Sequence, residues 1–416
     1  MYMTKLSSIA DYVTDKISSN DIALREYVTT DCILQNKKGR EIATNLPPQS
    51  CCLTRYQHGD VLIANIRPYL KKVWFADIDG GASSDVLVFR AKEGHSPSFL
   101  YAVLLQDSFF DYVMQGAKGS KMPRGDKEQI LRYEMPTLSC SEESIGTFFL
   151  NLDQKIRLNE QINQNLEAMA KQLYDYWFVQ FDFPDENGRP YKSSGGEMVW
   201  NEKLKRKIPA SWENKNIEDI ADVYNGATPS TINEQNYGGD IVWITPKDLS
   251  DQKQKFVYQG ERNISQAGYN SCSTHLLPPN TILMSSRAPI GLLSIAKTEL
   301  CTNQGFKSFV PKAENISTYL YYYLNIHIKQ IEQLGTGTTF KEVSREDVLK
   351  FPILKPSDAI LDLWEKQVSA LNNKQFVIQK ENEFLTKQRD ELLPLLMNGQ
   401  VSVNSDLAVS YITILR

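Results

Sequence analysis

Two long heptad patterns, repeated at one interval, constrain the fold of this chain more than any other feature. Apolar and amide side chains recur from Ile145 to Trp177 in steps that alternate between four and three residues. The same stepping recurs 219 residues later, from Trp364 to Leu396. A seam of this kind is typical of a helix that packs along another helix. At about 1.5 Å per residue, each pattern predicts a helix of roughly 50 Å.

The expected seam residues lie on both patterns. On the first they are Leu152, Ile156, Asn163, Leu166 and Leu173, and on the second Leu371, Ile378, Asn382, Leu385 and Leu392. Asn163 and Asn382 fall at equivalent positions, where a buried asparagine costs stability but fixes register and partner. The simplest arrangement pairs the two helices with each other, antiparallel, as a coiled coil. The alternative is that each seam packs on its own domain as an ordinary amphipathic helix, and the matched length and phase argue against it.

The segments that precede the two helical patterns also match each other. Leu6-Ser-Ser-Ile-Ala-Asp11 corresponds to Ile217-Glu-Asp-Ile-Ala-Asp222, and residues 59–67 correspond to residues 279–287. Each segment contains short strand patterns followed by a helix pattern. We therefore expect an α+β chain in which two similar mixed α/β domains are separated by two long antiparallel helices, as a pseudo-twofold internal repeat.

These patterns divide the chain into six segments. We expect a first domain over residues 1–140, a first long helix over 141–183, a connecting segment over 184–215, a second domain over 216–357, a second long helix over 358–400 and a C-terminal tail over 401–416. The connecting segment is rich in glycine, proline, serine and charged residues, which is typical of an exposed connection.

Charge and motif content narrow the possible functions. The formal net charge is −4, and residues 141–183 contain seven acids and three bases, so this segment holds the whole excess. Basic clusters elsewhere suit a protein that touches DNA in some places and protein in others.

The six cysteines and four histidines lack metal-ligand spacing, and we find no phosphate-binding loop or nucleotide-cofactor motif. We expect no catalytic residue, no metal and no cofactor in this chain.

The chain contains no apolar run long enough to span a bilayer. Its N-terminus also lacks a signal-peptide pattern. We therefore expect a cytoplasmic protein with no membrane partner.

Basic and hydroxyl side chains near two glycine-containing loops are the candidates for DNA contact. Guanidinium and ammonium groups bind phosphates, and loop donors and acceptors can reach base edges. The candidates in the first half are Arg67, Lys71, Lys72, Lys118, Ser120, Lys121 and Arg124. The candidates in the second half are Arg287, Thr336, Thr338, Thr339, Lys341 and Arg345. For any one of these residues, a solvated surface position is about as good an interpretation.

The helical segments and the region between them also carry a family resemblance. Its most specific stretch is Leu152-Asp-Gln-Lys-Ile-Arg-Leu-Asn-Glu-Gln-Ile-Asn-Gln-Asn-Leu-Glu167, which continues through residues 173–184, 188–196 and 208–212. The C-terminal counterpart is Gln388-Arg-Asp-Glu-Leu-Leu-Pro-Leu-Leu-Met-Asn-Gly-Gln-Val401. Over nearly its whole length, the chain resembles the specificity subunits of type I restriction–modification enzymes.

The resemblance implies two target-recognition domains, each of which reads half of a bipartite site in double-stranded DNA. It also implies that the paired helices set the gap between the half-sites and dock two methyltransferase subunits, which use S-adenosylmethionine to methylate adenine. Motor–nuclease subunits would complete a restriction complex. Two readers at a fixed separation suit half-sites at one helical phase, because a turn of B-DNA is about 34 Å.

Two other interpretations stay open. One is a non-catalytic protein–protein adaptor scaffold without DNA specificity. The less favoured one is a methyltransferase that acts alone. A DNA affinity that falls steeply with salt would separate a DNA reader from an adaptor.

Overall fold

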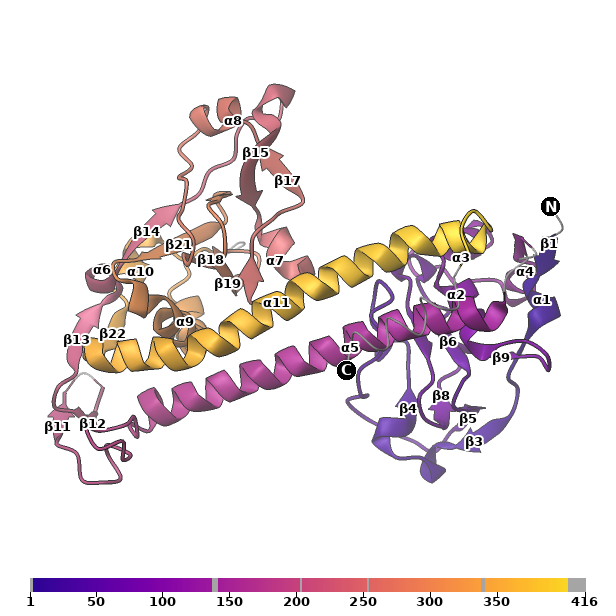
Figure 1. The fold of residues 1–416 in the computed structure, drawn as a ribbon, viewed down its shortest axis with the longest axis horizontal. Helices are drawn as coiled ribbons and strands as arrows, with labels where there is room; N and C mark the ends of the chain where they lie inside the picture. Colours follow the sequence, from indigo (N-terminus) through magenta and orange to yellow (C-terminus); the bar gives the residue numbers. More distant parts are fainter. Residues whose placement is uncertain (1–2, 137–140, 203, 253, 338–340, 403–416) are drawn as a thin grey trace. The chain divides into compact units, whose positions relative to one another are not determined.

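The structure is a computed structural model that describes residues 3–136, 141–202, 204–252, 254–337 and 341–402. The chain divides into two compact units (Figure 1). Unit 1 consists of Met1–Gln161 together with Lys380–Arg416, and unit 2 consists of Ile162–Gln379. Each unit therefore contains a globular part and a portion of both long helices. Residues 403–416 of the expected tail lie outside the described residues.

Unit 1 is built on two small sheets. The first has the antiparallel order β2-β9-β6-β7, with bounds Ala10–Tyr12, Val86–Ala91, Val61–Ala64 and Val73–Phe75. The second has the order β3-β5-β8-β4, with bounds Lys16–Ser18, Cys52–Tyr56, Gly80–Ala82 and Tyr27–Val28. In the second sheet β4 and β8 are parallel. A further pair joins β1 (Met3–Lys5) to β10 (Glu134–Pro136).

The first sheet of unit 1 is covered on both faces. Val61 and Ile63 of β6 belong to the core shared with the helices, whereas Leu62 between them belongs to a second core around Trp74. Successive side chains of a strand point to opposite faces, so one strand supplies both cores. A strand buried on both faces reads as a continuous apolar run, and Val61-Leu-Ile-Ala64 is such a run.

The core on one face of the first sheet includes residues of α1 (Leu6–Ile9), α2 (Pro97–Leu105), α3 (Asp107–Gln115) and α4 (Lys127–Ile130). Ser96 caps α2 by accepting a hydrogen bond from the backbone N–H of Phe99, and Pro97 occupies the first turn, where its missing N–H is not needed. The long helix α5 (Glu142–Tyr174) contacts this capped end through Gly146. A Cβ on Gly146 would lie 2.2 Å from the backbone nitrogen of Phe99, so the close approach requires glycine.

Unit 2 repeats this order of elements with longer pieces. The pair β13–β22 (Glu213–Asn216, Pro352–Lys355), the short helix α6 (Ile217–Ile220) and β14 (Ala221–Asn225) follow the order seen in unit 1. The larger sheet has the order β14-β21-β18-β19-β16. The bounds of its other strands are Phe306–Pro311 for β21, Ile282–Ser286 for β18, Ile290–Ala296 for β19 and Phe256–Val257 for β16. The motifs matched in the sequence, residues 6–11 and 217–222, thus begin equivalent helix–strand pieces.

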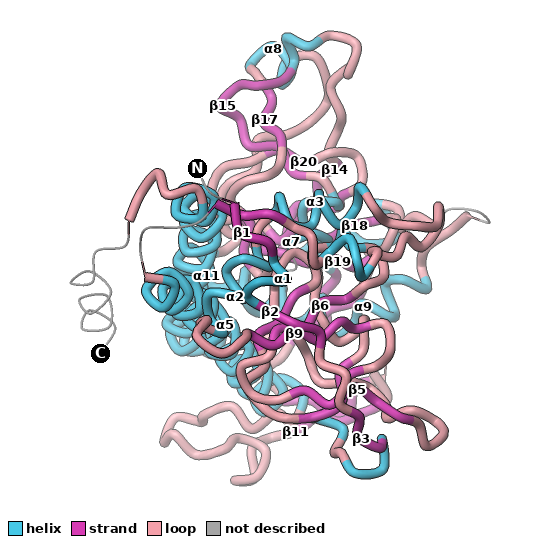
Figure 2. Tube along the Cα trace, turned by 90° about the vertical axis from the view of Figure 1, so that its right-hand side faces the viewer, coloured by secondary structure: helices cyan, strands magenta, loops and turns pink. Residues whose placement is uncertain are grey.

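The second sheet of unit 2 has the order β17-β15-β20, with bounds Arg262–Ile264, Tyr237–Ile244 and Cys301–Thr302. Figure 2 shows β15 and β17 beside α8 (Gln266–Asn270). The pairing of β15 with β20 is parallel, as is that of β4 with β8 in unit 1. Unit 2 further contains α7 (Pro246–Gln252), α10 (Arg345–Leu349) and the hairpin β11–β12 (Met198–Asn201, Arg206–Pro209).

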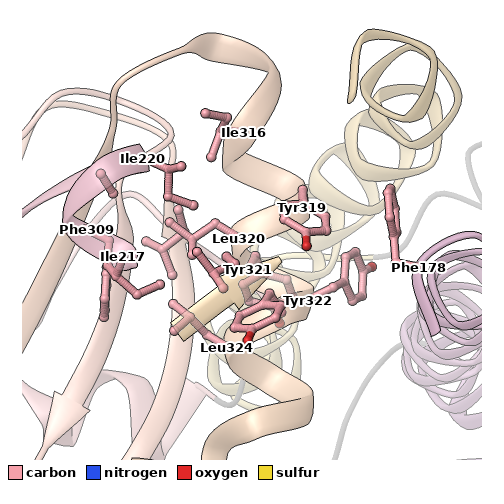
Figure 3. Packing of buried hydrophobic residues seen from close by; sticks show 14 of the residues in the cluster. Phe178, Ile217, Ile220, Phe309, Ile316, Tyr319, Leu320, Tyr321, Tyr322 and Leu324 are labelled. Atoms are coloured by element: carbon pink, nitrogen blue, oxygen red, sulfur yellow. The ribbon is translucent and has the colours of Figure 1, made fainter. Parts of the chain in front are cut away.

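Helix α9 (Ser317–Gln333) forms the centre of the core of unit 2. In Figure 3 its apolar side chains Leu320 and Leu324 lie beside Ile217 of α6 and Phe309 of β21. Tyr319 of α9 packs on the π-helical turn Asp175–Val179 that follows α5, where the rings of Tyr319 and Phe178 are 4.8 Å apart. Helix α9 therefore packs between the larger sheet of unit 2 and the end of α5.

The long helices α5 and α11 (Asp358–Met397) pack against each other within each unit. In unit 1, the side chain of Asn382 donates to the carbonyl of Ile156 at 3.2 Å. In unit 2, Asn163 donates to the carbonyl of Gln375 at 3.3 Å. The two donors, Asn163 and Asn382, are 219 residues apart, and so are the two acceptors, Ile156 and Gln375. The two units therefore make the same contact. In unit 1, Asp153 meets Arg389 and Asn159 meets Asn382, so the two helices are antiparallel there.

Candidate nucleic-acid interface

In unit 1, the loop of residues 118–124 is fixed to the end of strand β6. Lys118 and Arg124 exchange two backbone hydrogen bonds of 2.9 Å, which close the loop, and Gly119 has a φ of +99° inside it. The backbone N–H of Arg67, just after β6, donates to the carbonyl of Pro123 at 2.8 Å. Pro123 is buried, whereas Lys118, Ser120 and Lys121 are exposed. The backbone is therefore held inside the fold while the loop side chains face solvent.

Some of the basic side chains at this loop have an ion-pair partner and others have none among the described residues. Arg124 forms an ion pair with Asp85 at 3.1 Å, and Lys118 forms one with Asp126 at 2.9 Å. Within the described ranges, neither Arg67 nor Lys121 has an ion-pair partner. Exposed ion pairs contribute little to stability and exchange readily for other partners. The loop thus offers several cations to an anionic ligand.

A one-turn 3-10 helix, Pro68–Leu70, separates Arg67 from two further candidates. Arg67 and Lys71, which flank this turn, both have left-handed backbone conformations, with φ of +54° and +50°. Lys71 forms an ion pair with Asp107 at 2.8 Å. Lys72 donates to the carbonyl of Thr30, and burial lowers the pKa of Lys72. The ammonium groups of both lysines are therefore engaged by groups of unit 1.

Unit 2 holds the corresponding loop in the same way. Thr336 and Glu342 form an antiparallel bridge with hydrogen bonds of 3.1 and 3.0 Å, and Gly337 has a φ of +119°. The backbone N–H of Val343 donates to the carbonyl of Ser286, next to Arg287 at the end of β18. Lys341 is exposed, and the predicted contacts Thr338 and Thr339 lie outside the described residues. Since Lys118 and Thr336 occupy equivalent bridge positions, the two loops share a frame.

The side chains on this shared frame differ in charge. Where unit 1 has Arg124, unit 2 has Glu342, which lies 3.7 Å from Arg287 and 3.2 Å from the buried Lys307. The remaining candidate, Arg345, begins α10 and donates through its Nε to the carbonyl of Val223 at 2.6 Å. Equivalent closing bridges therefore carry different charged groups in the two units.

The predicted seam residues all lie on the covered sides of the long helices. Three are buried: Leu152, Ile378 and Leu385. The other seven are half-buried: Ile156, Asn163, Leu166, Leu173, Leu371, Asn382 and Leu392.

Two buried cations beside the long helices were not identified as such from the sequence. Arg389 lies on the α11 seam of unit 1 and contacts Asp153 at 3.0 Å. Lys255 of unit 2 contacts Glu167 and Asn372, both at 2.8 Å. Arg389 is visible as a charge at a seam position, but nothing near Lys255 in the sequence marks it as buried.

The described residues contain no group of three or more histidine, cysteine or acidic side chains placed to hold a metal ion. Among the helices of the same residues, none has the length and apolar character needed to cross a membrane. Unit 1 and unit 2 are thus similar α/β units, each with a loop fixed beside a strand-end arginine, so the architecture is internally duplicated.

Comparison with known proteins finds one matching domain and several similar chains. Residues 209–383 match the type I restriction modification DNA specificity domain. The chain is 38% identical over 192 residues to the specificity subunit of the type I restriction enzyme MjaIX from Methanocaldococcus jannaschii, which covers 45% of this chain and 44% of that subunit. It is 27% identical over 460 residues to the HindI specificity subunit from Haemophilus influenzae, covering 95% of this chain and 98% of that one.

A solved structure extends this similarity to the fold. The crystal structure of the type I restriction–modification S subunit from M. genitalium superposes with a TM-score of 0.60 at 14% identity, covering 94% of each chain. Residues 209–383 thus match the DNA specificity domain of this family, and over its whole length the chain is similar to a type I restriction enzyme specificity subunit. The resemblance found in the helical segments is thereby confirmed.

Proposed function

We propose that this chain is the DNA sequence-specificity subunit of a type I restriction–modification complex. Each unit acts as a target-recognition domain and reads one half of a bipartite site in double-stranded DNA. The observation that carries this proposal is the loop fixed beside a strand-end arginine, Arg67 in unit 1 and Arg287 in unit 2. A rigid backbone with exposed side chains is what base readout needs, because a misplaced donor loses its hydrogen bond.

The two units read different half-sites. A guanidinium such as that of Arg124 pairs well with guanine O6 and N7, whereas a carboxylate such as that of Glu342 accepts from the amino group of cytosine. Because these two residues occupy equivalent positions on a shared frame, the complete target is asymmetric.

The long helices separate the two domains as an antiparallel coiled coil in a pseudo-twofold repeat, and they dock two methyltransferase subunits. Leu158 on α5 and Val377 on α11, 219 residues apart, are both exposed apolar residues. Equivalent exposed positions on two repeated helices suit two copies of one partner, as an internal repeat presents the same surface twice. Those partners supply S-adenosylmethionine and the methyl transfer, so this chain is not itself an enzyme. Motor–nuclease subunits complete the restricting form of the complex.

Selection from randomised duplex DNA by the purified chain tests this proposal. We expect enriched sequences with two short half-sites at one constant gap, and an affinity that falls steeply between 50 and 200 mM salt. Arg67→Ala and Arg287→Ala should each relax one half-site only, with a loss of about 1–3 kcal/mol per affected base. Lys387→Ala, which removes an exposed cation from α11, is the matched control and should leave both half-sites unchanged. Absence of both enrichment and salt dependence would instead support a protein–protein adaptor.

A further inference from the structure

Two lysines of unit 1 share one carboxylate beside the candidate DNA-contacting turn. The ammonium groups of Lys37 and Lys71 both lie 2.8 Å from the same oxygen of Asp107. Lys37 also lies 3.5 Å from Asp390 of α11. The backbone N–H of Lys37 donates to the carbonyl of Lys71 at 2.9 Å, which keeps the two lysines adjacent.

The two lysines differ in what they can reach. The side chain of Lys37 is only 5% exposed, so its ammonium group is not accessible to a DNA phosphate. The side chain of Asp107, at the start of α3, is 55% exposed, and that of Lys71 is 30% exposed. Lys71 ends the short turn that begins at Arg67, and Arg67 is hydrogen-bonded to the 118–124 loop. An anion that approaches this turn therefore meets a lysine that already has a carboxylate partner.

We propose that Asp107 is a positioning residue for DNA binding: it holds Lys71 in an internal ion pair, and a DNA phosphate must compete with it for that lysine. This inference rests on the proposed function. Its consequence is that the turn attracts DNA of any sequence less strongly than its count of basic residues predicts. Recognition then depends more on Arg67 and Lys121, which have no ion-pair partner among the described residues.

The competition persists because Asp107 stays charged and stays in place. Partial burial favours its neutral form, but the ammonium groups of Lys37 and Lys71 outweigh that effect and lower the pKa of Asp107. If Lys71 moves to a phosphate, Asp107 is left with Lys37, which also lies beside Asp390, so the cluster has one carboxylate more than it has ammonium groups. Binding of Lys71 to the phosphate releases one counterion from the DNA, but the excess carboxylate beside Lys37 attracts one counterion from solution. The two changes cancel, so this contact adds little to the salt dependence of binding.

The salt dependence of DNA affinity tests this inference. Each phosphate that a cation neutralises contributes about −0.9 to the slope of log affinity against log salt. Asp107→Asn should steepen the slope by about one contact, which is about a 3.5-fold greater loss of affinity between 50 and 200 mM salt. Lys71→Gln in the Asp107→Asn background should remove that gain, whereas it should change the slope much less when Asp107 is present. Asp107→Glu, which keeps the carboxylate, should restore the wild-type slope.

Two further measurements separate the possible failures. Asp11→Asn removes a different exposed carboxylate of unit 1, paired with Lys92 at 3.2 Å, and should leave the slope unchanged. An Asp107→Asn slope equal to that of the wild type, or a steepening that Asp11→Asn reproduces, would overturn the inference. A wild-type chain that shows no salt-dependent DNA binding at all would overturn the proposed function together with it. Amide hydrogen exchange of unit 1 in each variant verifies that the fold is retained.

Discussion

The buried ion pair on the α11 seam of unit 1 makes a quantitative prediction. The side chains of Arg389 and Asp153 are 5% and 6% exposed, and their closest atoms are 3.0 Å apart. Tyr101 donates a hydrogen bond to the other oxygen of Asp153. Burial opposes the charge on Arg389, but the carboxylates of Asp153 and Asp390 outweigh it and raise the pKa of Arg389. The arrangement is stable because every charge has a partner.

Arg389→Met removes one partner and keeps much of the side-chain length. Asp153 is then a buried carboxylate with no cation, a change that costs about 3–5 kcal/mol. Since about 1.4 kcal/mol corresponds to one factor of ten, the most protected amides of unit 1 should exchange about two to four orders of magnitude faster. Hydrogen exchange followed by mass spectrometry measures this on peptides from β6 and β9, with peptides from β18 in unit 2 as the internal reference.

The double variant Arg389→Met, Asp153→Asn is the matched control. It removes both charges and leaves Tyr101 an acceptor, so protection in unit 1 should return to within about 1 kcal/mol of the wild type. If Arg389→Met alone changed protection by less than a factor of five, or if the double variant were no better than the single one, the charge-pair reasoning would be refuted.

Three further predictions concern single positions. Gly119→Ala should destabilise unit 1 by about 1–2 kcal/mol, because a side chain is strained at its positive φ, and urea unfolding should show no such loss for the neighbouring Ser120→Ala. Asn382→Leu should raise the thermal stability of unit 1 while loosening the helix register, seen as additional assembly states by native mass spectrometry; an unchanged melting temperature and a single state would contradict this. Burial lowers the pKa of His327, so the unfolded chain gains a proton more readily as the pH falls. Unit 2 should therefore lose stability from pH 7.5 to 5, and His327→Gln should lose less; equal losses would rule this out.

The long helices could be predicted because their information is local and periodic. Apolar spacing alone places Leu152 and Leu385 on covered faces, and the interval of 219 residues relates Asn163 to Asn382 before any contact is known. The same interval relates the hydrogen bonds that these two asparagines make. When a sequence pattern repeats, a contact expected in one copy is also expected at the equivalent positions of the other copy.

The partners of charged side chains could not be predicted in this way. Lys37 and Asp390 are 353 positions apart, and no local pattern relates them. Lys255 lies in a polar stretch that reads as a solvated loop, yet four acceptors from three helices surround its ammonium group. Such contacts arise only when distant elements pack, which is why Lys71 could be predicted as a basic candidate but not as the partner of Asp107.

Methylome sequencing of the source cells tests the central claim, that this chain reads a two-part DNA site for a methyltransferase, most directly. We predict that deletion of the chain abolishes methylation at one motif made of two half-sites with a constant gap. Arg67→Ala and Arg287→Ala should each degrade methylation through opposite halves of that motif. An unchanged methylome after deletion, or the same half affected by both substitutions, would contradict the account.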